Sequence, residues 1–75
     1  MDRKAIGTML KELRGERSMA EVAKELGCTA MAISLWERGE RIPSDDMKIK
    51  IAAFYGKSVA EIFFTGEANG TLTLA

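Results

Sequence analysis

Helix start and stop signals recur at short intervals along this sequence. Ser18 stands three residues before Glu21, and Ser58 stands three residues before Glu61. At that spacing the serine oxygen accepts from the backbone N–H of the glutamate, the glutamate side chain accepts from that of the serine, and a helix begins. Glycines, which tolerate the left-handed conformation, follow the apolar segments and end them. The pattern predicts an all-α chain of five short helices and a tail.

Apolar side chains recur at helical spacing within these segments. Ile6, Leu10 and Leu13 fall on one stripe of the first helix, and Ile33 and Trp36 fall on the inner face of the third. The set expected to be buried in the fourth helix is Met47, Ile51, Ala52 and Tyr55. The expected helices are one over residues 3–16, one from Ser18 to Gly27, one over residues 30–37, one from Ser44 to Gly56, and a short one that Ser58 opens.

The length of the chain limits it to one domain. Its 75 residues cannot divide their apolar side chains between two cores and stabilise both. We expect the domain to cover residues 1–65. Residues 66–75 are expected to be a tail that is flexible or, in the alternating segment TLTL, a short strand added to a second copy of the chain.

The composition argues against a catalytic or metal site. The chain has no histidine and one cysteine, Cys28, so the commonest general base and metal ligand is missing, and neither an internal disulfide nor a thiolate zinc cluster can form. Its carboxylates are scattered among lysines at helical spacing, which is typical of solvated helix faces. We therefore expect no catalytic residue, no metal, no cofactor and no enzymatic activity.

The hydropathy of the sequence predicts a cytoplasmic location. No apolar run approaches the roughly 20 residues that a membrane-spanning helix needs. Met1 is followed by Asp2, Arg3 and Lys4 and then by an interrupted amphipathic pattern, which a signal peptide does not show. We expect a cytoplasmic protein that makes no membrane contact.

Residues 18–37 combine two short helices with a sharp turn. Gly27 stands where the chain must reverse its direction, and Ala23 is small at a position where a large side chain would hold the two helices apart. Thr29 can cap the second helix of the pair. Two short helices joined by such a turn form a helix-turn-helix.

With these residues the chain resembles the Xre or lambda-repressor-like (Cro/CI-type) helix-turn-helix regulators of bacteria and phages. The segments that carry the resemblance are IGTMLKELR (6–14), EVAKELGCTAMAISLWERGERIPS (21–44) and KIKIAAFYGKSVAEIFF (48–64). The resemblance implies a compact five-helix DNA-binding domain whose helix-turn-helix is formed by the second and third helices. It also implies that the third helix enters the major groove of double-stranded DNA.

The resemblance further implies roles for individual residues. Arg14 and Glu37 match positions that often form an ion pair between the first and third helices, and such a pair would orient the third helix. Met19 stands where the family usually has a glutamine that binds phosphate. The residues implied to contact DNA are Ser18, Met19, Thr29, Ala30, Met31, Ser34, Leu35, Arg38 and Arg41.

Charge and polarity leave two functions open. Eleven Lys and Arg balance eleven Asp and Glu over the whole chain, whereas DNA-binding domains usually carry a basic excess. Affinity for DNA is therefore expected to be modest, unless side chains outside the helix-turn-helix also face it; those are Arg3, Lys4, Arg17 and Lys48. Ala30, Met31 and Leu35 either contact thymine methyl groups or form an apolar patch for a protein partner.

The function that we expect is a small repressor-like transcriptional regulator that binds an operator as a homodimer. The alternative is a protein-interaction module on the same scaffold. Three apolar residues lie off the expected core stripes and are candidates for the dimer interface, although each could equally belong to the core: Ile49, Phe54 and Phe64.

Overall fold

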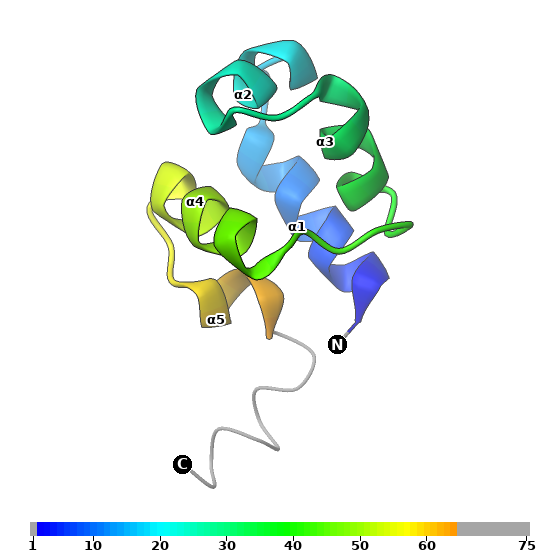
Figure 1. Ribbon diagram of the computed structural model, residues 1–75. Helices are drawn as coiled ribbons and strands as arrows, with labels where there is room; N and C mark the ends of the chain where they lie inside the picture. The colour runs from blue at the N-terminus through cyan, green and yellow to red at the C-terminus, as the bar shows by residue number, and fades with distance from the viewer. Residues whose placement is uncertain (1, 65–75) are drawn as a thin grey trace, which may run out of the picture.

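The computed structural model describes residues 2–64 of the chain, and in this range it contains five α-helices and no strand. The helices are α1 (Arg3–Arg14), α2 (Met19–Leu26), α3 (Ala30–Glu37), α4 (Asp45–Tyr55) and α5 (Val59–Phe63). The all-α fold expected from the sequence is confirmed (Figure 1). The tail expected over residues 66–75 lies outside the described residues.

Each helix begins at a polar residue whose side chain accepts a hydrogen bond from a backbone N–H three positions along. These N-terminal caps are Asp2, Ser18, Thr29, Ser44 and Ser58. Both capping boxes predicted from the sequence are present, one at α2 and one at α5. The caps satisfy N–H groups that have no partner within the first turn of a helix, and so they set where each helix starts.

The first helix ends two residues earlier than the sequence predicted. Gly15 has a φ of 61°, and the side chain of Arg17 turns back over the end of α1. The guanidinium of Arg17 donates to the carbonyl oxygens of Leu13 and Arg14, at 3.1 and 3.2 Å. These bonds satisfy two of the terminal carbonyls, so that α1 stops at Arg14.

The helices enclose a single core to which all five contribute. Its members are Ile6, Leu10, Val22, Ala23, Leu26, Ile33, Trp36, Ile51, Ala52, Ile62 and Phe63. The contacts between helices pair α1 with α3 and α5, α2 with α3 and α4, and α4 with α5 (Figure 1). Of the set expected to be buried in α4, Ile51 and Ala52 are buried, whereas Met47 and Tyr55 are only half-buried, because they lie at the two ends of that helix.

Two glycines determine how the helices approach one another. Gly27 ends α2 with a φ of 74°, and its backbone N–H donates to the carbonyls of Ala23 and Lys24, which produces the sharp turn before α3. Gly7, in the middle of α1, is buried against the end of α3. A β-carbon on Gly7 would lie 2.9 Å from the carbonyl oxygen of Trp36 and would overlap that of Glu37. The backbones of α1 and α3 can touch there only because residue 7 has no side chain.

None of the helices between residues 2 and 64 is long and apolar enough to span a membrane.

Candidate nucleic-acid interface

Helix α3 is anchored to the core by one face and leaves the opposite face open. Ile33 and Trp36 are 4% and 8% exposed, and they hold the inner face of α3 against α1 and α2. Thr29 caps the start of the helix by accepting from the backbone N–H of Ala32 at 3.1 Å. Figure 1 shows α3 at the side of the bundle opposite the connection between α4 and α5. The outer face of α3 is therefore available to a partner.

The outer face of α3 carries an apolar row. Met31 and Leu35 are four residues apart, and so they lie on the same side of the helix. Met31 is 64% exposed and Leu35 is half-buried. Together with Thr29, Arg41, Pro43 and Ser44 they line an open groove between α3 and the segment that leads to α4. Arg41 is the one charged residue in the lining of this groove.

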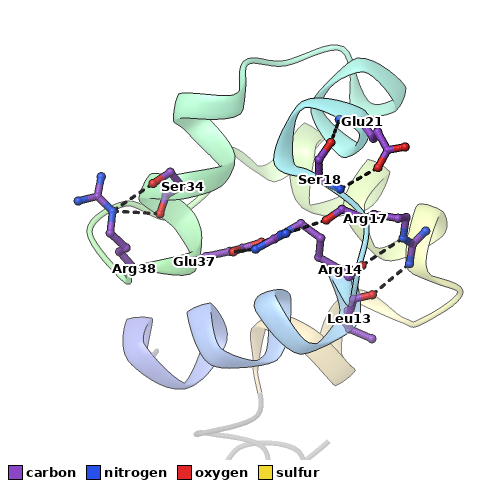
Figure 2. A network of polar contacts seen from close by, with 8 residues as sticks. All are labelled: Leu13, Arg14, Arg17, Ser18, Glu21, Ser34, Glu37 and Arg38. Atoms are coloured by element: carbon purple, nitrogen blue, oxygen red, sulfur yellow. Dashed lines mark hydrogen bonds and ion pairs between the residues drawn. The ribbon is translucent and has the colours of Figure 1, made fainter.

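A polar row runs beside the apolar row. It consists of Ser34 and Arg38, four residues apart, and continues the line of the small apolar residue Ala30 at the start of the helix. The Arg38 Nε donates to the Ser34 Oγ at 3.2 Å (Figure 2). An Nη of the same guanidinium lies 3.0 Å from a carboxylate oxygen of Glu40. Both side chains of this ion pair are 53% exposed. Arg38 is thus folded back along α3 and already holds an anion.

The two ends of the helix-turn-helix offer different groups to a phosphate. Ser18 and Met19 begin α2, but the Ser18 oxygen is engaged by the backbone of Glu21, and Met19 packs against the core. Their side chains are therefore occupied. Arg41, by contrast, is exposed, and within residues 2–64 no carboxylate forms an ion pair with it.

Four cations outside the helix-turn-helix were considered as further contacts to DNA, and two of them, Arg17 and Lys48, contact aromatic rings on another side of the molecule. The guanidinium carbon of Arg17 lies 5.2 Å from the ring centre of Phe54 and 5.4 Å from that of Tyr55. The Lys48 Nζ lies 5.9 Å from the ring centre of Phe63 and 3.5 Å from Asp45. Cation–π contacts of this length hold both groups away from α3.

The other two cations lie next to the end of α3. Gly39 packs against the first turn of α1 so closely that a β-carbon there would be 3.2 Å from the carbonyl oxygen of Arg3. Arg3 and Lys4 are both exposed. The positive charge available beside α3 therefore comes from Arg41 and from the start of α1.

An ion pair joins the end of α1 to the end of α3. The Arg14 Nε donates to the Glu37 Oε2 at 2.7 Å, and the Nη2 donates to the Oε1 at 3.0 Å (Figure 2). The remaining Nη1 donates to the carbonyl of Arg17 at 2.7 Å. The side chains are only 14% and 4% exposed, and the hydrogen bonds that Arg14 donates to Glu37 raise the pKa of Arg14 above its ordinary value. This bidentate pair holds α3 at a defined angle to α1.

The three candidates for the dimer interface differ in how exposed their side chains are. Ile49, on α4, is 61% exposed, and with Met31 it makes up the exposed large apolar residues of the described chain. Phe54 is half-buried under Arg17 and packs edge-on against Tyr55, with ring centres 5.0 Å apart. Phe64 is half-buried at the end of α5. Of the three, Ile49 has the side chain most accessible to a second copy.

Comparison with known families decides what this arrangement is. Residues 10–62, well over half of the chain, match the model of the helix-turn-helix family of the Cro/C1 type. The protein belongs to this family. This family is one of DNA-binding regulatory domains and not of enzymes. In this protein α2 and α3 form the helix-turn-helix motif within the five-helix bundle. The chain has no match among the curated proteins or the solved structures with which it was compared.

Some of the residues that shape this helix-turn-helix site were missed by the sequence analysis. Glu40 entered only the total of the charges, but its carboxylate forms an ion pair with the guanidinium of Arg38. Gly7 was not singled out, although a glycine inside a helical pattern often has a packing reason. Within residues 2–64 no three or more His, Cys, Asp or Glu side chains are grouped so as to hold a metal ion.

Proposed function

We propose that this protein is a sequence-specific transcriptional regulator of bacterial or phage type. In this proposal it acts as a repressor in the cytoplasm, binding an operator in double-stranded DNA as a homodimer, with α3 in the major groove. The observation that carries the proposal is the open outer face of α3, which Ile33, Trp36 and the Arg14–Glu37 pair hold rigidly. It is bordered by Arg41, which has no ion-pair partner among residues 2–64. A major groove of about 12 Å width admits one helix held in this way.

The proposed contacts divide into those that position the protein and those that read bases. Arg38 and Arg41, which flank the C-terminal end of α3, would bind phosphates, as would the backbone N–H groups of Met19 and Ala20 at the start of α2. The residues proposed to face base edges are Thr29, Ala30, Met31, Ser34 and Leu35. Two such helices in a two-fold dimer would meet half-sites about 34 to 36 Å apart.

The experiment that tests this function is a selection of bound sequences from random double-stranded DNA, followed by titrations at about 50 and about 200 mM salt. Two cationic phosphate contacts in each protomer predict that log K falls with log salt with a slope of about −2 per protomer. Arg41→Ala is expected to reduce this slope by about 1 without changing the selected sequence.

Lys57→Ala is the matched control, because Lys57 is exposed in the connection between α4 and α5, on the side away from α3 (Figure 1). It should leave both the affinity and the slope unchanged. If no sequence is enriched even at the lower salt concentration, the proposed function is wrong.

A protein-interaction module is the alternative function, and the 64% exposure of Met31 is the observation that favours it. An exposed apolar row on a folded helix is typical of a surface that binds another protein. This alternative predicts that a partner bound by the wild-type chain is lost with Met31→Glu and kept with Arg41→Ala. The proposed DNA-binding function predicts that both substitutions weaken the binding of selected DNA.

A further inference from the structure

We infer that α3 selects its operator mainly through the C5-methyl groups of thymine, which Met31 and Leu35 contact in the major groove. The inference rests on the proposed function, because it names the chemical group of DNA that the outer face of α3 recognises. It goes beyond that function in specifying thymine-bearing half-sites. It also gives Met31 the role of a specificity-determining residue.

The apolar row is the first observation behind this inference. Met31 and Leu35 lie on one side of α3 and line the same groove, and Met31 is 64% exposed. Among the groups that the four bases present in the major groove, the thymine methyl is the apolar one, and the others are hydrogen-bond donors and acceptors. An apolar side chain that enters the major groove therefore binds favourably by burying its surface against a thymine methyl group, and it gains little affinity from any other base.

The hydrogen bonds within α3 are the second observation. The Thr29 hydroxyl oxygen accepts from the backbone N–H of Ala32, and that of Ser34 accepts from the Arg38 Nε at 3.2 Å. Each hydroxyl keeps one O–H with which to donate to a base. Bidentate recognition of guanine or adenine requires Arg, Lys, Asn or Gln, and from Ala30 to Glu37 the helix carries none of these residues. Hydrogen bonds alone thus provide little discrimination between bases.

The charge around the groove is the third observation, and it favours DNA over an apolar protein segment. Arg41 is the charged residue in the lining, and no carboxylate contributes to it. Arg41 borders the same groove as Met31 and Leu35, so a strand whose phosphate binds Arg41 brings its bases towards the apolar row. A polyanion that carries methyl groups matches this combination of one cation and two apolar side chains.

The test uses the duplex obtained by selection from random DNA. Each thymine of one half-site is replaced in turn by deoxyuridine, which removes the C5-methyl group and keeps the base pairing. At one or more positions the affinity of the wild-type protein is expected to fall about fourfold, the effect of one lost methyl contact. Replacing the thymine–adenine pair at such a position by 5-methylcytosine–guanine restores the methyl group and should recover most of that affinity.

Two variants assign the contact to the side chain. With Met31→Ala, the loss caused by deoxyuridine is expected to shrink to less than twofold, because the methyl group no longer has a partner. Met31→Leu keeps an apolar side chain and should retain the sensitivity. Both variants are expected to fold, since residue 31 is exposed on a helix and Ala and Leu are strong helix formers. Ala53→Ser, at an exposed position of α4, is the control and should retain the full effect of deoxyuridine.

The outcomes separate this inference from the proposed function. A methyl effect that is abolished by Met31→Ala and kept by Met31→Leu supports the inference. A selected sequence that is bound equally well with deoxyuridine at every thymine overturns the inference but leaves the proposed function standing. The same holds if the methyl effect persists at every position in Met31→Ala. If the selection enriches no sequence, both the function and the inference are overturned.

Discussion

At the level of single residues, the orientation of α3 depends on the pair of Arg14 and Glu37. Glu37 is 4% exposed and borders an apolar cavity of about 10 Å³, so its carboxylate is removed from water and is balanced by one guanidinium. A buried charge that loses its partner is far more costly than one that keeps it. The pair therefore makes the position of α3 sensitive to a single substitution in α1.

We expect Arg14→Met to destabilise the protein by about 3 kcal/mol, because it leaves the Glu37 carboxylate buried without a partner. The double variant Arg14→Met, Glu37→Leu should recover most of the loss, since leucine suits the apolar cavity beside residue 37. Urea unfolding of the three proteins measures both effects. The control is Arg38→Met, which breaks an ion pair of two half-exposed side chains and should change the stability by less than about 1 kcal/mol. Equal losses in the single and double variants would contradict this account.

Glu40 is a second single residue that matters, because its carboxylate competes with DNA phosphate for Arg38 in the proposed contact. Its carboxylate lies 3.0 Å from the guanidinium, in the place that a phosphate would take. We expect Glu40→Gln to raise the affinity for selected DNA about threefold to fivefold and to leave the salt slope near about −2 per protomer, because Arg38 binds a phosphate in both proteins but no longer has to leave a carboxylate. Glu25→Gln removes the same charge from α2 beside the groove near Phe54, and it should change the affinity by less than twofold. An unchanged or lower affinity for Glu40→Gln would show that Glu40 supports the contact instead of competing for it.

At the level of elements, α1 and α3 pack closely because Gly7 allows their backbones to touch. A methyl group on residue 7 would overlap the carbonyl of Glu37, and that atom belongs to a helix that cannot shift without moving Trp36 out of the core. In an exposed helix, replacing glycine by alanine would instead stabilise the protein by about 1 kcal/mol. The clash lowers the free energy of unfolding and the helix propensity raises it, so the sign of the measured change shows whether the two backbones are in contact.

We expect Gly7→Ala to destabilise the protein by about 1 to 3 kcal/mol, since the clash with the backbone of α3 outweighs the gain in helix propensity. Urea unfolding measures the change. Thr8→Ala, at the adjacent exposed position of α1, should stay within about 0.5 kcal/mol of the wild type. A stabilised Gly7→Ala variant would mean that the two helices are further apart than described here.

At the level of the whole molecule, the positive and negative charges are equal in number, but the cations differ in whether they already have a partner. Arg17 and Lys48 contact aromatic rings, Arg14 and Arg38 bind carboxylates, and Arg41 stays available beside α3. A single protomer with few free cations beside α3 gains little affinity from phosphates. Two linked protomers double the number of contacts, which is a physical reason for the proposed dimer.

We expect Ile49→Glu to abolish the proposed dimer, because residue 49 is the most exposed of the dimer candidates, and a carboxylate there could not be buried against a second copy. Sedimentation equilibrium should show a monomer, and binding to a duplex with two half-sites should lose its cooperativity. Lys50→Glu places the same charge one position along α4 and should leave the dimer intact. A dimer that survives Ile49→Glu would place the interface elsewhere.

Much of the fold could be predicted from local patterns. The start of every helix follows from a polar cap, and the turn of the helix-turn-helix follows from Gly27, because both depend on residues within a few positions of one another. The end of α1 was predicted two residues too late. Its determinants are also local, Gly15 with its positive φ and the Arg17 side chain bonded to carbonyls three and four residues back, but cap patterns do not show in which direction a long side chain turns.

The sequence predicted which residues share a face of α3, but it did not predict their exposure or their contacts. Helical spacing places Met31 with Leu35 and Ser34 with Arg38, whatever surrounds them. That Gly7 lies against the end of α3 and that Arg14 reaches Glu37 are consequences of packing between segments 23 to 30 residues apart. That Arg38 is held by Glu40 depends on how the chain turns after α3. Caps and periodicity act through neighbouring peptide units, whereas the free charge and exposed apolar surface of a face depend on which distant side chains reach it.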